Sequence, residues 1–450
     1  MRITVCFLTG IFITFAAGNC AFSKTLPQND INKRIEYVNI AFWEQFEDEY
    51  LKNYILCAVK NNHEAKSTLY KSEQFRQEMK SSFANELPSL NVAANYLGLK
   101  IPMLDNFAFK KNGFVLPFQF NYEADLLLKN RDKTKSKHKL HKAQKYDEKS
   151  AYIMLAGDVA TTYINILKFD KTISLQEKLV KNREEILKRT ENKFYFGTIS
   201  KTELNNGIKD YNTAYEELEE LLKQRSLLLD NLALLIAQSA QNSSKLKRGD
   251  IDNFAKNLSI PLEISSDKIF TRPDVQSALY KLQSAKIDIT VAKKDFFPTF
   301  NITGFYVFNT LGPGNFFSWR STFAALIAGA AQDIFTGGKK IANLRLKKAR
   351  YDELFENFLQ TDLNAIKEVN DALYQTRHDI KIYNEAKNIY AIHKNNFELE
   401  EKRFTRGTVD FISLLEEDID FIDSNQNLLE KKAQKFVDVV SLYKAAGGNL

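Results

Sequence analysis

Carboxylates gather near the C-terminal end of this 450-residue chain, where Glu416, Asp418, Asp420 and Asp423 follow one another closely. Like charges at short range repel unless cations or protonation relieve them. An arrangement that brings several copies of the cluster together would therefore favour cations. On a single chain, the simplest interpretation is the solvated acidic face of a helix.

A second charged segment, residues 129–149, carries Lys or Arg at nine positions. It indicates either the solvated start of a helix or contact with anionic lipid headgroups where the chain leaves a membrane. His138 and His141 lie three residues apart in this segment, but no acidic residue or cysteine accompanies them as a metal ligand. We therefore predict no metal site.

Motifs for catalysis are absent from the sequence. It contains no P-loop, no Rossmann glycine pattern, no zinc-ligand spacing and no nucleophile elbow. We therefore expect neither an enzyme nor a cofactor, and a partner would have to supply the energy for any transport. A net charge of +7 is too dilute over 450 residues to indicate a nucleic-acid partner.

The segment 1–21 resembles a secretory signal peptide, with Arg2 ahead of the apolar segment 5–17 and small residues after it. Cleavage after Ala21 is one possibility. Cleavage before Cys20 would instead create a lipid-bearing N-terminus, although Asn19 makes a poor lipidation motif. No later stretch is apolar enough for a spanning helix, so a membrane could be crossed only by a closed β-barrel.

Alternating and helical periodicities together predict the order of elements. Strands are expected at about 88–97, 114–124, 298–309 and 320–331, with a loop at 98–113. Long helical hairpins are expected at about 137–240 and 339–446, and a polar linker at 241–271. In the third strand, Phe300, Ile302 and Tyr306 are assigned to a lipid face, and Thr299, Asn301 and Thr303 to a lumen face.

The two halves of the chain match at one fixed offset in the numbering. Pro88 corresponds to Pro298, and Gly197 corresponds to Gly407 at the same offset. The chain is therefore predicted to contain two copies, 31–240 and 272–450, of helix, strand, strand and long helical hairpin. Four strands cannot close a barrel with a usable interior, so several chains must pool their strands.

Several segments resemble outer-membrane efflux proteins of the TolC type: RPDV at 272–275, FFPTFNITG at 296–304, FGTIS at 196–200, RGTVDFISLLE at 406–416 and LYKAAGG at 442–448. The resemblance implies a mainly α-helical protein with a membrane β-barrel. Three protomers would form a 12-stranded barrel in outer-membrane lipid and an α-helical barrel in the periplasm. Its partners would be a periplasmic adaptor and an inner-membrane pump.

The resemblance also implies roles for particular residues. The ends of the two helical hairpins would contact the adaptor, and the start of the last helix would form a periplasmic gate. Glu416 stands where the family commonly has Asp. Ile419 stands where some relatives have a basic residue, so the salt bridges that such a residue could form at the gate are not expected here. The expected adaptor contacts are Phe196, Gly197, Thr198, Ser200, Arg406, Gly407, Thr408 and Asp410, and the expected gate residues are Ile412, Leu415 and Glu416.

The function expected from this resemblance is passive passage of drugs or other small solutes through a tripartite efflux system. A type I secretion duct for proteins and a heavy-metal efflux duct are alternatives with the same fold. A coiled-coil scaffold without a pore is an alternative of a different class, and the four amphipathic strands argue against it.

Overall fold

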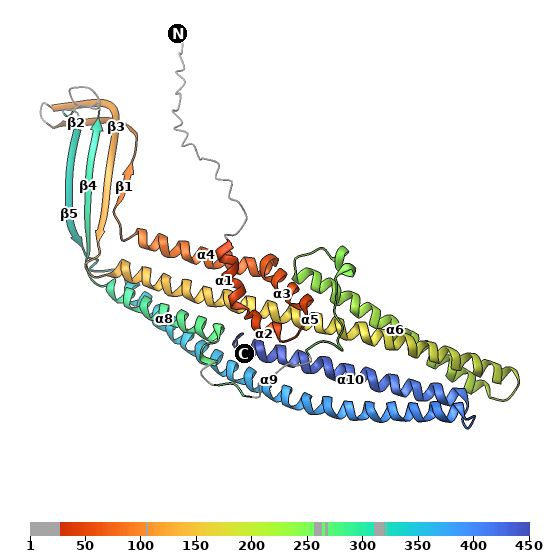
Figure 1. The fold of residues 1–450 in the computed structure, drawn as a ribbon. Helices are drawn as coiled ribbons and strands as arrows, with labels where there is room; N and C mark the ends of the chain where they lie inside the picture. Colours follow the sequence, from red (N-terminus) through yellow and green to blue (C-terminus); the bar gives the residue numbers. More distant parts are fainter. Residues whose placement is uncertain (1–27, 105–106, 256–262, 266–268, 310–318, 320–321) are drawn as a thin grey trace, which may run out of the picture.

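The structure, a computed structural model, describes residues 28–104, 107–255, 263–265, 269–309, 319 and 322–450. The expected signal peptide and Cys20 lie outside these residues. Long helices run side by side through most of the molecule, and a sheet of strands extends from one end of them (Figure 1).

Six of the described helices form three pairs of equal length. Each of these helices in the first half has a partner at the equivalent place in the second half. The pairs are α4 (His63–Ala84) with α8 (Pro273–Lys294), 22 residues each, α5 (Lys129–Tyr195) with α9 (Lys339–Thr405), 67 residues each, and α6 (Lys201–Leu235) with α10 (Phe411–Ala445), 35 residues each. The longest of these helices extend for about 100 Å.

Left-handed backbone conformations recur at the same offset, at points where a helix begins or ends. Gly197 and Gly407 have φ angles of 71° and 70° at the ends of α5 and α9. Ala237 and Gly447 occupy the equivalent places after α6 and α10, with φ angles of 58° and 64°. The two copies therefore share turn geometry as well as helix lengths.

The long helix of the first copy begins earlier than expected, at Lys129 instead of near residue 137. The basic segment 129–149 therefore forms its first turns. Asp125 caps this end, because its carboxylate accepts hydrogen bonds from the backbone N–H groups of Lys129, at 2.6 Å, and Arg131, at 2.9 Å.

The sheet has the order β1-β3-β4-β5, and β2 also pairs with β3. All pairings are antiparallel. The strands are β1 (Ser89–Val92), β2 (Asn95–Leu104), β3 (Phe107–Ala124), β4 (Thr299–Asn309) and β5 (Thr322–Ala331).

The loop expected at 98–113 is wrong, because β2 and the first half of β3 occupy these residues. Gly98, Pro102 and Gly113 suggested a turn. Among the described strands, however, β2 pairs only with β3, so its other edge tolerates a proline without an N–H donor. The expected strand at 88–97 is likewise two strands, interrupted after Val92.

The register of the sheet collects apolar side chains on one face. Phe118 pairs with Tyr306, which pairs with Ala324, and Phe120 pairs with Gly304. Directly paired residues point to the same side of an antiparallel sheet. The opposite face carries most of the polar side chains of β1, β3 and β4, namely Ser89, Asn91, Gln119, Asn121, Glu123, Thr299, Asn301 and Thr303.

Three short helices lie near the N-terminus, and the second of them packs against the end of the last helix. They are α1 (Gln28–Tyr37), α2 (Ile40–Glu44) and α3 (Glu49–Asn61). The Tyr443 hydroxyl donates a hydrogen bond to the Val38 carbonyl at 2.6 Å, and the Phe42 ring stacks on Tyr443 with centroids 4.6 Å apart. The first and last parts of the fold are thereby joined through a buried aromatic cluster.

Arg272 joins the start of the second copy to the end of the chain. Its buried guanidinium donates to the carbonyl of Ala445 at 2.7 Å and pairs with Asp274 and Glu368, each at 2.7 Å. Gly447 lies directly against Arg272, and a Cβ there would come within 3.2 Å of the arginine backbone. The segments RPDV and LYKAAGG therefore belong to one structural unit.

The segment expected as a polar linker, 241–271, packs into the core where the structure describes it. Its start lies in a short 3₁₀ helix, η1 (Ala240–Lys245). Ile251 and Phe254 are buried, and the Ala255 N–H donates to the Phe46 carbonyl at 2.9 Å. A few apolar residues anchor a segment whose overall composition is polar.

Among the described residues, no helix combines the length and the low polarity needed to cross a membrane.

Candidate functional site at the hairpin ends

The first helical hairpin reverses direction between α5 and α6. Gly197 donates its N–H to the Phe194 carbonyl at 2.9 Å, and Thr198 donates both its N–H and its hydroxyl to the Lys193 carbonyl. Ser200 then caps α6, because its hydroxyl accepts from the Glu203 N–H while the Glu203 carboxylate accepts from the Ser200 N–H. The turn is thus held by its own hydrogen bonds.

The second hairpin repeats this arrangement between α9 and α10. Gly407 donates its N–H to Phe404, and Thr408 donates its N–H and hydroxyl to the Arg403 carbonyl at 3.0 and 2.9 Å. Asp410 caps α10 by accepting from the N–H and hydroxyl of Ser413. These two hydrogen bonds, the backbone one first, lower the pKa of the Asp410 carboxyl.

Aromatic side chains project from the end of the first hairpin. Tyr195 is 84% exposed and Phe196 is 75% exposed. Both lie at the end of the helices farthest from the sheet (Figure 1). Large apolar side chains this exposed are typical of surfaces that bind another protein. Tyr195 was not among the residues expected to contact a partner, although it stands beside Phe196 in the sequence.

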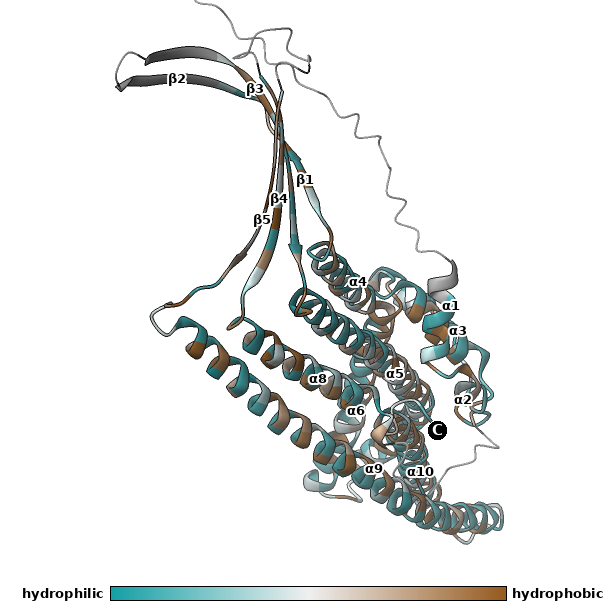
Figure 2. Cartoon of the chain, turned by 90° about the vertical axis from the view of Figure 1, so that its left-hand side faces the viewer, coloured by the Kyte–Doolittle hydropathy of each residue, from teal (hydrophilic) through white to brown (hydrophobic). Residues whose placement is uncertain are grey.

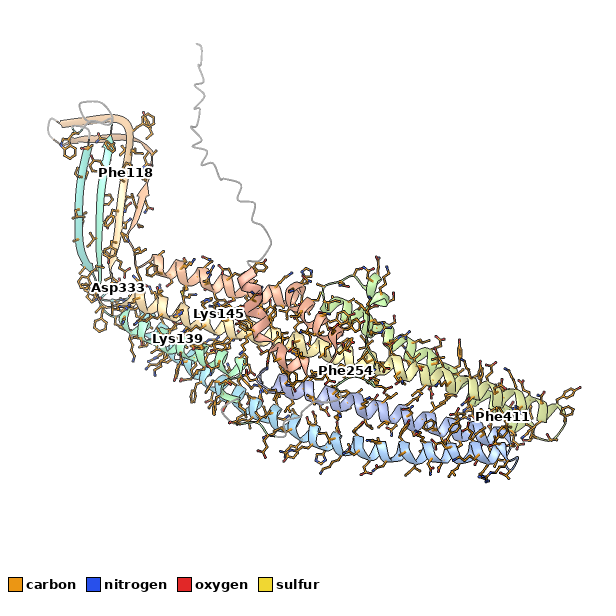
Figure 3. All side chains as sticks on the ribbon, in the orientation of Figure 1. Phe118, Lys139, Lys145, Phe254, Asp333 and Phe411 are labelled. Carbon is orange, nitrogen blue, oxygen red and sulfur yellow. The ribbon has the colours of Figure 1, made fainter. Side chains whose placement is uncertain are left out.

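The two hairpins contact each other near their ends. The Lys193 ammonium lies 3.6 Å from the Asp410 carboxylate, and the Arg189 guanidinium lies 4.2 Å from the ring centroid of Phe411. Figure 3 labels Phe411 in this region of the molecule. Sequence patterns did not single out Lys193 or Arg189, because both contacts join helices from different halves of the chain.

The first turns of α10 have two different faces. Leu415 is only 8% exposed and Ile419 only 2%, and both belong to the apolar core of the protomer, with Ile412 packed against it. Leu415 thus packs within the protomer, and its expected place at the gate stays a prediction. Glu416 is exposed on the other face.

The carboxylates of α10 also lie on different faces of the helix. Glu416, Asp420 and Asp423 are exposed and spaced by four and three residues, so they form one stripe along the helix. Asp418 points elsewhere and accepts a hydrogen bond from the Asn182 amide at 2.6 Å. Although the Asp423 side chain reaches solvent, neighbouring groups partly desolvate its carboxyl, and this desolvation together with the nearby Asp420 carboxylate raises its pKa. We call Glu416, Asp420 and Asp423 the acidic stripe.

Comparison with known proteins identifies the family. The profile described as "Outer membrane efflux protein" matches residues 57–238 and 265–448. The chain belongs to the outer membrane efflux protein family. Members of this family are efflux channels in the outer membrane, so the expectations of a TolC-like channel, an outer-membrane location and no enzymatic activity are confirmed.

Curated relatives cover almost the whole chain. The solvent efflux pump outer membrane protein SrpC of Pseudomonas putida is 23% identical over 90% of this chain and 86% of its own length. The cation efflux system protein CusC of Escherichia coli K12 is 23% identical over 94% of this chain and 92% of its own length.

Among solved structures, the CmeC outer membrane channel of Campylobacter jejuni aligns with a TM-score of 0.83 at 22% identity. The alignment covers 92% of this chain and 89% of that one. At this level of identity the likeness establishes a shared fold.

Proposed function

We propose that this protein is the exit duct of a tripartite efflux pump. Three copies would pool their strands into a 12-stranded barrel, and their helices would form a tunnel in the periplasm. Solutes would pass through passively, driven by an inner-membrane pump that a periplasmic adaptor connects to the duct.

The observation that carries this proposal is the uncovered sheet. No helix packs on either face of it within the described residues (Figure 2). In the part of the chain that the structure describes, β5 and the β1–β2 side have no partner strand on their outer edges. Open strand edges tend to pair with other chains, and an apolar face needs lipid or protein to cover it. β4 and β5, with 11 and 10 residues, have the length of about 9–11 residues that spans a bilayer.

Exposed apolar side chains along α9 support an oligomer of the helical part. A single helix in water would not leave so many large apolar groups uncovered along its length. The residues at least half exposed include Ile341, Leu346, Leu363, Tyr374, Ile392 and Leu399. Neighbouring protomers would cover this surface in a closed ring of helices.

The hairpin ends would serve two purposes in the duct. Tyr195 and Phe196 would bind the adaptor, next to the turns at Gly197 and Gly407. Ile412 and Glu416 would lie at the periplasmic opening, with Leu415 packed behind them. Repulsion between acidic stripes of neighbouring protomers would favour cations there and make the opening easy to loosen.

The names of the relatives cover solvent and cation efflux, and the same duct fold could serve either. No group of three metal-ligating side chains occurs among the residues that the structure describes. The proposed use is efflux of small solutes, a class that includes the cargo of both relatives.

The test combines fractionation with conductance. The protein should be recovered from the outer membrane, migrate as a heat-modifiable trimer on gels, and conduct ions in planar bilayers. A monomeric protein in the soluble fraction, with no conductance after purification, would overturn the duct. Conductance without any effect of gene deletion on solute tolerance would favour the secretion duct instead.

A further inference from the structure

A cavity on the sheet-proximal half of the helices has an unusual lining. It lies between α1, α5 and α8, beside the region where Figure 3 labels Lys139 and Lys145. Three lysines, Lys142, Lys145 and Lys149, line it together with histidine and tyrosine side chains, and no carboxylate lines it. The cavity therefore presents positive charge without an internal counter-ion.

Among the described residues the lysines of the cavity lack a direct counter-ion, although the Lys145 ammonium acts on the Glu148 carboxyl through space. Within the part of the chain that the structure describes, none of the three forms an ion pair. The nearby carboxylates are engaged elsewhere: Glu148 faces Arg34 at 3.5 Å, and Asp147 pairs with Lys281 at 3.0 Å. Partial burial lowers the pKa of Lys149. Burying an ammonium group without a counter-charge is unfavourable, so a bound anion would relieve this cost at Lys149.

A buried histidine completes the polar lining. His141 is 7% exposed and lines the cavity, and its Nδ1 atom has no hydrogen-bond partner among the described residues. Burial lowers the pKa of His141, and Lys145 lowers it further, while a backbone hydrogen bond at Ser72 opposes them. Buried polar atoms in folded proteins are nearly always paired, so an unpaired ring nitrogen here indicates a ligand atom or a water that completes the site.

Aromatic rings form the remaining wall. Tyr146 and Tyr280 stack with centroids 5.6 Å apart, and the Lys142 ammonium lies 5.7 Å from the Tyr280 centroid. Lys139 lies 5.3 Å from the same centroid and donates to the Gln283 amide oxygen at 2.8 Å. Lys142 is thus held over the Tyr280 ring, whereas Lys145 is exposed at the cavity.

We propose that this cavity is a binding site for a phosphate-bearing ligand, held by Lys142, Lys145 and Lys149. A doubly charged phosphoryl group matches three ammonium groups better than a single carboxylate does, and its oxygens can accept several charge-assisted hydrogen bonds. The proposal does not depend on the duct function.

The position of the cavity bears on the source of the ligand. Lys145 follows the first residue of α5 by 16 positions, which is about 24 Å along the helix axis. That distance separates the cavity from the end of the sheet. A soluble or polymeric phosphate is therefore favoured over the headgroup of a lipid in the same membrane, and the experiment distinguishes the two.

Binding is measured on the full-length protein in detergent by isothermal titration with inorganic phosphate and with glycerol 3-phosphate, at fixed ionic strength. The test variant is Lys142→Gln/Lys145→Gln. The matched control is Lys178→Gln/Lys181→Gln, which removes two exposed lysines of the same helix away from the cavity. We expect the test variant to bind about tenfold more weakly or worse, and the control to bind like the unmodified protein.

A second arm embeds each protein in nanodiscs of phosphatidylcholine with and without phosphatidylglycerol and measures retained lipid by native mass spectrometry. Loss of phosphatidylglycerol retention in the test variant alone, without binding of soluble phosphate, would assign the site to a lipid headgroup. Equal loss in both variants would show general attraction between charges and would overturn the proposal. So would the absence of binding to the unmodified protein in both arms.

Discussion

Asp438 provides a quantitative test of the packing between α9 and α10. Its side chain is 2% exposed, and its Oδ1 accepts a hydrogen bond from the Gln434 amide at 2.8 Å. The carboxyl of Asp379, on α9, lies beside it. Burial, together with this second carboxyl, raises the pKa of Asp438 to about 7. The Asp438 carboxyl therefore takes up a proton on folding.

The sign of the pH dependence follows from this proton uptake. The folded state binds more protons than the unfolded state between about pH 4 and pH 7, so the free energy of unfolding falls as pH rises through that window. The pKa of such a carboxyl rises from about 4 in the unfolded state to about 7 in the folded state. The free energy of unfolding then falls by about 4 kcal/mol between about pH 4 and pH 7. Above about pH 7 the pair contributes no further change.

The variant Asp438→Asn keeps the shape of the side chain and removes its titration. We expect unfolding in guanidinium, followed by circular dichroism, to show a loss of stability between about pH 4 and pH 7 for the unmodified protein and a much smaller loss for the variant. Asp352→Asn, at an exposed position of α9, is the control and should follow the unmodified protein. Parallel pH profiles for the unmodified protein and Asp438→Asn would refute the proton uptake at this pair.

Three further predictions concern the hairpins and the contacts of Arg272 within the second copy. Glu416→Ala should raise single-channel conductance and weaken cation preference in planar bilayers; unchanged values would remove Glu416 from the opening. Gly407→Ala should destabilise the protein by about 1 kcal/mol, since alanine is strained at a φ of 70°, and an unchanged thermal midpoint would contradict this. Arg272→Met should destabilise by about 3 kcal/mol or more, because it leaves the buried Ala445 carbonyl without its donor; Arg350→Met, at an exposed salt bridge, should have little effect in the same denaturation assay.

The repeat could be predicted because it rests on local signals. Proline before a strand and glycine at a hairpin turn are recognisable in any copy, and one fixed offset in the numbering connects them. The equal lengths of α5 and α9 follow from the same offset. The alternation in β4 was also visible, and the register places Phe300 and Thr299 on opposite faces as expected.

What could not be predicted depends on contacts between distant segments. Leu415 has the spacing of a residue near an opening, but its burial is decided by the hairpin that packs against it. Phe254 lies in a polar segment, so its anchoring role appears only beside Phe46 and Phe436. Asp438 looks like any solvated acidic residue of α10, and only the position of Asp379 reveals the pair.

The contact between Val38 and Tyr443 has a consequence for the order of folding. It closes a loop across a separation of 405 residues, and the loop-length term of its entropic cost is about 5 kcal/mol. Contacts this distant in sequence form late and slow the folding rate. Before Tyr443 is in place, Phe42 and Trp43 lack their principal aromatic partner. Their apolar rings therefore stay exposed while most of the chain is still being synthesised. The interval before this closure is therefore when the chain most needs protection from aggregation.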